Sequence, residues 1–129
     1  MSKKDNRITV LVVEPHRAPD VKEISNTLEA LQHEVGGYIQ AVYPWYEPVA
    51  LLCDEESKLK GAEFNRALWD ENGEVYDIIS GTFLIVGLTE DDFGSLSENL
   101  IKQFKECFGK PEEFINIDGR LVVLSMIVD

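Results

Sequence analysis

Residues 34–87 read EVGGYIQAVYPWYEPVALLCDEESKLKGAEFNRALWDENGEVYDIISGTFLIVG, and this stretch decides what kind of domain the chain can form. It contains both tryptophans, all four tyrosines, a Gly-Gly pair and an Asn-Arg pair between short apolar runs. Apolar runs separated by turn residues are typical of strands joined by hairpins. Such a density of aromatic side chains suits a binding surface, and it equally suits a core packed beneath hairpins. The stretch indicates a small α+β domain and does not by itself indicate an activity.

The composition of the whole chain is that of one globular domain. The chain has 129 residues, 44% of them hydrophobic and 28% charged. We therefore expect a single domain over residues 1–129, with a polar N-terminal lead at residues 1–6. No apolar run approaches the roughly 18 residues that cross a bilayer, and the polar MSKKDNR start is unlike a signal peptide. We expect a cytoplasmic protein with no membrane partner.

The charge balance narrows the kinds of partner. The chain carries 24 acidic and 12 basic residues, for a net charge of −12. A field of this sign repels phosphate backbones, so we do not expect nucleic-acid binding. The charge suits a basic partner, or a decoy that imitates DNA, and it is also an ordinary solubility charge that requires no partner. The sequence does not determine the oligomeric state.

The N-terminal segment predicts a strand followed by a long amphipathic helix. Residues 8–13 are β-branched and almost continuously apolar, as in a strand covered on both faces. Asp20 is a predicted N-cap, with Glu23 at the spacing of a capping box. The apolar face of this helix is predicted to consist of Val21, Ile24, Leu28, Leu31 and Val35. Gly36-Gly37 ends the helix, and Gly36 is expected in the left-handed conformation.

The middle of the chain predicts short strands around one helical turn. Strands are expected at residues 38–43, 49–53, 75–79 and 82–86. The first two flank a proline-bounded aromatic loop and predict an antiparallel pair. Residues 64–68 are assigned to a helical turn. Asn72-Gly73 is a strong turn signal. Gly81 marks a bend, a bulge or a close backbone approach between the last two strands.

The C-terminal third predicts a second amphipathic helix and a hairpin. Residues 89–92 are expected to open the helical region, with a further cap at Ser95. The closing strands, 114–117 and 121–128, flank Asp118-Gly119, which has the composition of a two-residue hairpin loop.

Together these elements predict an α+β fold in a single domain. It has a mixed β-sheet, two amphipathic helices that cover one face of that sheet, and a C-terminal β-hairpin. We expect the first and second strands to pair in parallel across the first helix, through the usual right-handed crossover.

No arrangement of residues predicts a catalytic or metal site. Cys53 and Cys107 belong to no CxxC and are expected to be buried thiols. His16 and His33 are expected in solvent and complete no metal-binding spacing. The acidic clusters fall in turns and at helix starts, where local hydrogen bonds favour carboxylates. We expect no cofactor, no metal and no catalytic residue.

The best candidate site is centred on Arg66, which is conspicuous in an acidic region. Arginine can hold a carboxylate or phosphate through two parallel hydrogen bonds, and a neighbouring aromatic ring can stack on it. The candidate ligand-binding residues are Asn65, Arg66, Trp69, Asp77 and Thr82, with Tyr38, Gln40, Tyr43 and Trp45 as the opposite wall. The competing interpretation is that Arg66 pairs internally with Asp77 or Glu74 and pins a loop to the sheet.

Four segments occur in order along the chain: VGGYI at 35–39, AVYP at 41–44, NRAL at 65–68 and YDIISGTF at 76–83. Together they resemble a family of bacterial and phage domains of unknown function, over residues 8–126. The resemblance implies a setting in phages and mobile elements, chiefly of Gram-positive bacteria. It brings no reaction, ligand or catalytic residue.

Three functions remain open at this point. The first is a non-enzymatic binding protein that engages a host protein or a small molecule through the aromatic and Asn-Arg region. The second is an acidic DNA mimic or anti-defence inhibitor that works through its carboxylates. The third is an enzyme of unrecognised type. Replacing Arg66 by alanine should abolish binding in the first case and leave it intact in the second.

Overall fold

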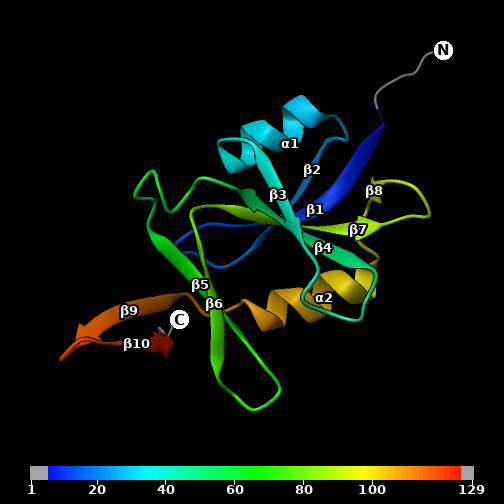
Figure 1. Cartoon of the computed structure of the whole chain (residues 1–129). Coiled ribbons are helices and arrows are strands. Elements are labelled where there is room, and N and C mark those ends of the chain that lie inside the picture. The colour runs from blue at the N-terminus through cyan, green and yellow to red at the C-terminus, as the bar shows by residue number, and fades with distance from the viewer. Residues whose placement is uncertain (1–5, 126–129) are drawn as a thin grey trace.

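The computed structural model describes residues 6–125, which form one α+β domain (Figure 1). The strands are β1 (Arg7–Val13), β2 (Asp20–Ser25), β3 (Ile39–Val42), β4 (Val49–Asp54), β5 (Phe64–Trp69), β6 (Val75–Ser80), β7 (Phe83–Leu88), β8 (Phe93–Gly94), β9 (Glu112–Ile117) and β10 (Arg120–Ser125). The helices are α1 (Leu28–Val35) and α2 (Glu98–Cys107). The central sheet has the order β2-β1-β7-β4-β3 with β8 paired to β7, while β5-β6 and β9-β10 form separate two-stranded sheets. The expected fold class, with two helices and a C-terminal hairpin, is confirmed.

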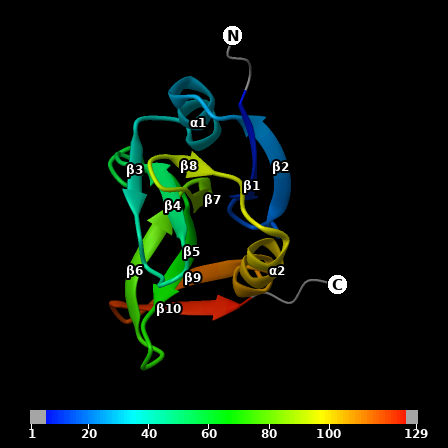
Figure 2. The same ribbon diagram turned by 90° about the vertical axis from the view of Figure 1, so that its right-hand side faces the viewer.

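The central sheet is buried on both faces, and one helix covers each face (Figures 1 and 2). Side chains alternate between the faces along each strand. Phe104 of α2 packs with one set of residues: Leu11, Val13, Leu51 and Ile85. Leu31 and Val35 of α1 pack with the alternate set: Val10, Val12, Leu52 and Leu84. The expectation that both helices cover one face is wrong, because strands apolar at successive positions need cover on both sides.

The first helix is much shorter than predicted. Residues 20–25 form β2, which pairs with β1 so that Val10 lies opposite Lys22. Val21, which was predicted on the apolar face of a helix, lies in this strand and is 47% exposed. The helix begins after Thr27, whose Oγ1 accepts a hydrogen bond from the Ala30 N–H at 3.1 Å. It ends as predicted at Gly36, which has a φ of 88°.

The predicted parallel pairing is also wrong. All the strand pairs within residues 6–125 are antiparallel, so the sheet is not the mixed sheet that was expected. β1 and β3 are separated by β7 and β4, so the segment containing α1 connects strands that are not neighbours. The predicted antiparallel pairing of the two strands around the aromatic loop is confirmed, with Gln40 opposite Cys53.

The second hairpin contains the largest local correction. Residues 64–68, predicted as a helical turn, belong to strand β5, which pairs with β6 and places Arg66 opposite Ile79. Tertiary pairing overrode the local propensity, because Leu68 and Ile79 bury themselves in the same cluster as Phe104. The β5–β6 hairpin and α2 therefore lie on the same side of the central sheet.

The C-terminal elements follow the prediction more closely. Helix α2 begins after Ser97, whose Oγ accepts a hydrogen bond from the Leu100 N–H at 3.2 Å. The predicted starts at residues 89–92 and at Ser95 are therefore wrong. Asp118 and Gly119 both have positive φ, as a two-residue hairpin loop requires. The expected polar lead up to residue 5 and the last part of the expected final strand, 126–128, lie outside the described residues. Within the described range, no helix is long and apolar enough to cross a membrane.

Candidate functional site

Arg66 lies in the interior of the protein and is only 1% exposed. Its guanidinium donates to the carbonyl oxygens of Arg17 at 2.7 Å and Phe108 at 2.9 Å, and to Asn65 Oδ1 at 2.7 Å. Two longer bonds reach Phe108 O and Asn65 O, both at 3.3 Å. Arginine has five N–H donors, so these contacts occupy all of them. Arg66 thereby ties β5 to the end of α2 and to the β1–β2 loop.

The predicted internal ion pair of Arg66 is not formed. Asp77 pairs instead with Lys58, whose Nζ lies 3.2 Å from Asp77 Oδ1. Burial lowers the pKa of Arg66, and the charge of Glu112 partly opposes that shift. Asn65 is also fully buried, with its amide nitrogen donating to the carbonyl oxygens of Val13 and Gly81. Asn65 and Arg66 therefore act as hydrogen-bond donors to carbonyl oxygens in the core.

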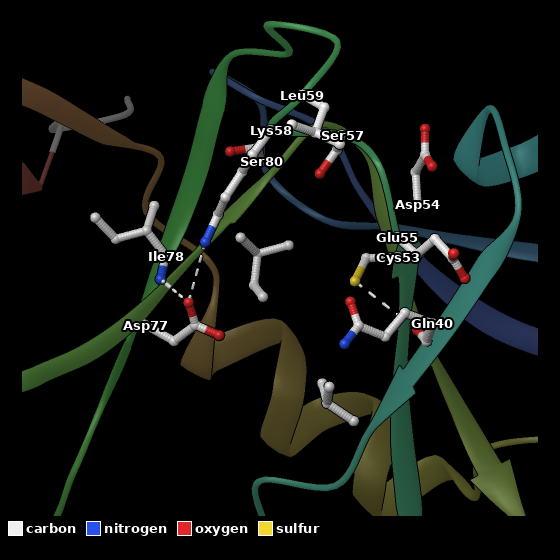
Figure 3. A pocket seen from close by; sticks show the side chains of 12 residues that line it. Gln40, Cys53, Asp54, Glu55, Ser57, Lys58, Leu59, Asp77, Ile78 and Ser80 are labelled. Carbon is white, nitrogen blue, oxygen red and sulfur yellow. Dashed lines mark hydrogen bonds and ion pairs between the residues drawn. The ribbon is translucent and has the colours of Figure 1, made fainter.

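Two other predicted residues, Gln40 and Asp77, line a small polar cavity between the β3–β4 and β5–β6 hairpins (Figure 3). The cavity has a volume of about 120 Å³. The Lys58–Asp77 ion pair forms one wall, and Gln40 and Cys53 form the facing wall (Figure 3). Ser80 also lines the cavity. Among the described residues, its hydroxyl is the one buried side-chain polar atom without a hydrogen-bond partner.

Neither thiol is activated as a nucleophile by its surroundings. Burial raises the pKa of Cys53, and the charges of Asp77 and Asp54 raise it further. Desolvation likewise raises the pKa of Cys107, with Glu112 and Glu47 adding to the shift. Both groups are therefore held as neutral thiols near pH 7. The prediction that Cys53 is buried is confirmed, whereas Cys107 is exposed at the end of α2.

The largest hollow among the cavities described is an aromatic groove with a volume of about 510 Å³. Its aromatic lining comes from the β3–β4 loop and the β5–β6 hairpin: Tyr43, Trp45, Tyr46, Trp69 and Tyr76. Asp70 and Glu71, in the turn after β5, form its acidic rim. Trp69 is 48% exposed and Tyr46 is fully exposed, so these rings present apolar surface to solvent.

An inner pocket of about 130 Å³ continues from this groove and shares Trp45, Trp69 and Tyr76 with it. The rest of its lining consists of Pro44, Ala67, Leu68, Cys107, Phe108 and Glu112. Glu112 Oε1 accepts a hydrogen bond from the Ala67 N–H at 2.8 Å, which fixes the carboxylate against β5.

Trp45 is held in place by the rings beneath it. Its ring centroid lies 4.7 Å from that of Phe104 and 6.1 Å from that of Phe108, both edge to face. Such contacts stabilise one ring orientation. The groove therefore has at least one wall anchored in the core of the domain.

The electrostatics of the groove and inner pocket are negative. The residues that line them include three carboxylates and no lysine, arginine or histidine. Partial burial raises the pKa of Tyr76, and the charges of Asp77 and Asp70 add to that shift. The phenol is thus neutral and available as a hydrogen-bonding group near pH 7. The arrangement favours a ligand that carries positive charge and apolar surface together.

The structure separates the predicted site residues into three places. Tyr43, Trp45 and Trp69 meet in the aromatic groove, Gln40 and Asp77 in the polar cavity, and Asn65 and Arg66 in the core. Tyr38 and Thr82 line neither hollow.

Sequence reasoning missed Tyr46, Tyr76 and Glu112 as lining residues. Tyr46 lies in the proline-bounded aromatic loop that the sequence predicts, so its position in that loop indicates that it could line the groove. Tyr76 follows Val75, the partner of Trp69, and assigning residues 64–68 to a strand would have placed it beside Trp69. Glu112 enters from a distant segment, and no local pattern predicts its approach.

No group of three or more His, Cys, Asp or Glu side chains within residues 6–125 is placed to hold a metal ion. His16 is exposed in its loop, as expected, with Nε2 at 3.3 Å from Glu63 Oε2. His33 is also exposed. The aromatic groove with its inner pocket and the polar cavity are the hollows that contain most of the predicted site residues.

The fold defines a small α+β domain that carries an acidic, aromatic groove on its surface. A family model described as "Domain of unknown function (DUF3846)" matches residues 8–109, and the chain belongs to this family. The matched range ends before β9, so Glu112 comes from the segment that follows it. Neither the curated proteins nor the solved structures that were compared include a match to the chain.

Proposed function

We propose that this protein is a non-enzymatic binding protein whose aromatic groove holds a positively charged segment of a partner protein. The observation that carries the proposal is the lining of the groove and its inner pocket. Six aromatic side chains and three carboxylates line the two hollows, without a basic side chain among the lining residues. Aromatic rings exposed around a hollow are typical of the surfaces that dominate binding energy in protein interfaces.

The physical argument combines two attractions that act on the same ligand. Cations are attracted to the faces of tryptophan and tyrosine rings, and burial against the rings strengthens that attraction. The acidic rim and the net charge of −12 draw basic segments toward the groove over a longer range. A neutral or acidic segment would gain the apolar contact alone.

The non-enzymatic part of the proposal is supported by the chemistry of the side chains that line the hollows. Both cysteines have raised pKa values and are held as thiols. His16 and His33 belong to the lining of neither the groove nor the polar cavity. The groove and the inner pocket thus lack a histidine that could activate a nucleophile as a base.

The test uses the two tryptophans as reporters, because both line the groove. Fluorescence is recorded while the protein is titrated with a short peptide of alternating arginine and glycine. The same titration with a peptide of equal length, in which glutamate replaces arginine, is the control for charge. We expect the basic peptide to shift the emission at a concentration at which the acidic peptide does not. Trp69→Ala should weaken this binding about tenfold, with Trp45 as the remaining reporter.

Tyr38→Ala is the matched control variant, because Tyr38 is an aromatic residue of 67% exposure that lies outside the groove. It should bind the basic peptide as the wild type does. Equal responses to the two peptides, or equal losses in the Trp69 and Tyr38 variants, would contradict the proposal.

The high acidity favours one alternative, an acidic DNA mimic or anti-defence inhibitor. In that case binding to a DNA-binding protein would depend on exposed carboxylates such as Glu90 and Asp91. It would weaken in a Glu90→Gln, Asp91→Asn variant and survive Trp69→Ala. The setting in phages and mobile elements that the resemblance implies is compatible with either function and forms part of this proposal.

A further inference from the structure

We infer that the inner pocket binds one alkylammonium or guanidinium head group, between the rings of Trp45 and Trp69 and with Glu112 as its counter-charge. The inference rests on the proposed function, and it adds the chemical class of the group that enters the pocket. The source of the head group is either a lysine or arginine side chain of the partner or a free small amine.

The walls of the pocket match this chemistry. Trp45, Trp69 and Tyr76 are among the residues that line it, and Glu112 supplies a carboxylate from β9. Cations prefer a position over an aromatic face within about 6 Å of the ring centre. The pocket volume of about 130 Å³ is well below the roughly 300–1,000 Å³ of pockets for drug-sized ligands. It is therefore suited to one head group, while the wider groove accommodates the chain that bears it.

Glu112 retains hydrogen-bonding capacity for such a ligand. Its Oε1 accepts from the Ala67 N–H at 2.8 Å. Within the part of the chain that the structure describes, no protein group is hydrogen-bonded to Oε2. A bound ammonium or guanidinium group could donate to that oxygen in a charge-assisted hydrogen bond.

Arg66 carries a positive charge that opposes a cation in the pocket, since its guanidinium interacts with the charge of Glu112. Its guanidinium lies behind the pocket wall, and its five donors point to the oxygens of Arg17, Asn65 and Phe108. Arg66 does not line the pocket. The guanidinium of Arg66 weakens the attraction between Glu112 and a bound cation, but it does not occupy the pocket. The aromatic rings must therefore contribute much of the affinity.

Cys107 gives a direct readout of occupancy, since it lines the pocket and is the exposed cysteine, whereas Cys53 is buried. The rate of Cys107 alkylation by iodoacetamide is followed by peptide mass spectrometry in the presence of tetramethylammonium chloride. Two controls are used at the same concentration. Tert-butanol has a similar apolar shape without a charge, and sodium chloride gives the same ionic strength. We expect protection by tetramethylammonium and none by the other two additives.

The decisive variant is Glu112→Gln, because glutamine keeps an acceptor for the Ala67 N–H and removes the charge. Since Glu112 also affects the reactivity of the thiol, the compared quantity is the ratio of rates with and without tetramethylammonium. We expect the concentration that gives half-protection to rise about tenfold in Glu112→Gln and in Trp69→Ala. Protection by tert-butanol equal to that by tetramethylammonium, or undiminished protection in Glu112→Gln, would overturn the inference.

The peptide titration distinguishes failure of this inference from failure of the proposed function. If the arginine–glycine peptide binds in a manner that depends on Trp69, but is unaffected by Glu112→Gln and not displaced by tetramethylammonium, the groove functions without a cation in the pocket. The inference would then be wrong and the proposed function would stand. If tetramethylammonium protects Cys107 while neither peptide binds, the pocket serves a free amine, and the proposed protein partner would be wrong.

Discussion

Arg66 is a charged residue that acts as part of the core. The sequence presents it as a candidate ligand contact, but each of its N–H donors is bonded within the protein. A buried guanidinium is tolerated because carbonyl dipoles replace the water that it loses. The expectation that Arg66→Ala tests ligand binding must therefore be replaced by an expectation about folding.

We expect Arg66→Met to lower the free energy of unfolding by at least about 3 kcal/mol, because buried carbonyl oxygens lose their donors. The measurement is urea unfolding followed by circular dichroism. Arg17→Met is the control, since the Arg17 side chain is 66% exposed and contributes only its carbonyl oxygen to the Arg66 cluster. Arg17→Met should change the free energy of unfolding by no more than about 0.5 kcal/mol. Similar costs for the two variants would contradict this account.

Ser80 presents the opposite case, a buried hydroxyl without a protein partner among the described residues. An unsatisfied buried polar group costs stability that an apolar replacement does not. We expect Ser80→Ala to raise the free energy of unfolding by about 1 kcal/mol, measured in the same urea experiment. A loss of stability would instead mean that the hydroxyl is hydrogen-bonded within the polar cavity.

At the scale of elements, the C-terminus of α1 is joined to the end of β4 by a small polar cluster. Lys60 Nζ lies 2.7 Å from Asp54 Oδ2 and donates to the Gly36 carbonyl oxygen at 3.2 Å. Burial acts to raise the pKa of Asp54, but hydrogen bonds from Lys60 and the Glu56 N–H outweigh it and leave the pKa below its ordinary value of 3.8. A Cβ at Gly37 would lie 2.6 Å from this carboxylate, so any larger residue there would displace the Asp54 side chain.

The lowered pKa of Asp54 gives a stability contribution with a defined pH dependence. It is fully present above 3.8, the ordinary pKa, and is lost as the pH falls through the lower pKa of the folded state. We expect Asp54→Asn to cost about 1 kcal/mol at neutral pH and to differ little from the wild type at strongly acidic pH. Urea unfolding across this pH range is the measurement. A difference between the two proteins that did not change with pH would contradict the assignment.

At the scale of the whole molecule, the net charge of −12 acts against the compact state. Salt screens this repulsion between exposed carboxylates, so the midpoint of thermal unfolding should rise by a few degrees between about 20 mM and about 300 mM sodium chloride. Calorimetry measures the shift. The Glu90→Gln, Asp91→Asn variant should respond less to salt, since it carries less charge. A midpoint that does not change with salt would mean that the self-repulsion is negligible.

The parts of the fold that the sequence predicted correctly depend on local chemistry. Gly36 ends α1 because a left-handed residue is needed there, and Asp118-Gly119 closes the β9–β10 hairpin for the same reason. The segments predicted wrongly, 20–25 and 64–68, have apolar spacings compatible with either helix or strand. Residues 20–25 form a strand because they pair with β1, and residues 64–68 form a strand because they pair with β6. Such pairing depends on residues outside the segment itself.

By itself, the sequence determined the α+β class, the hairpin turns, the burial of residues 8–13 and the concentration of aromatic residues between Tyr38 and Tyr76. Only the tertiary structure decided which of those aromatic rings meet, that Arg66 faces inward, and that Glu112 reaches the same pocket as Trp45 and Trp69. The physical reason is one of range. Turns and strand runs are set by backbone preferences of adjacent residues, whereas a site is set by the packing of elements whose contacts are distant in sequence.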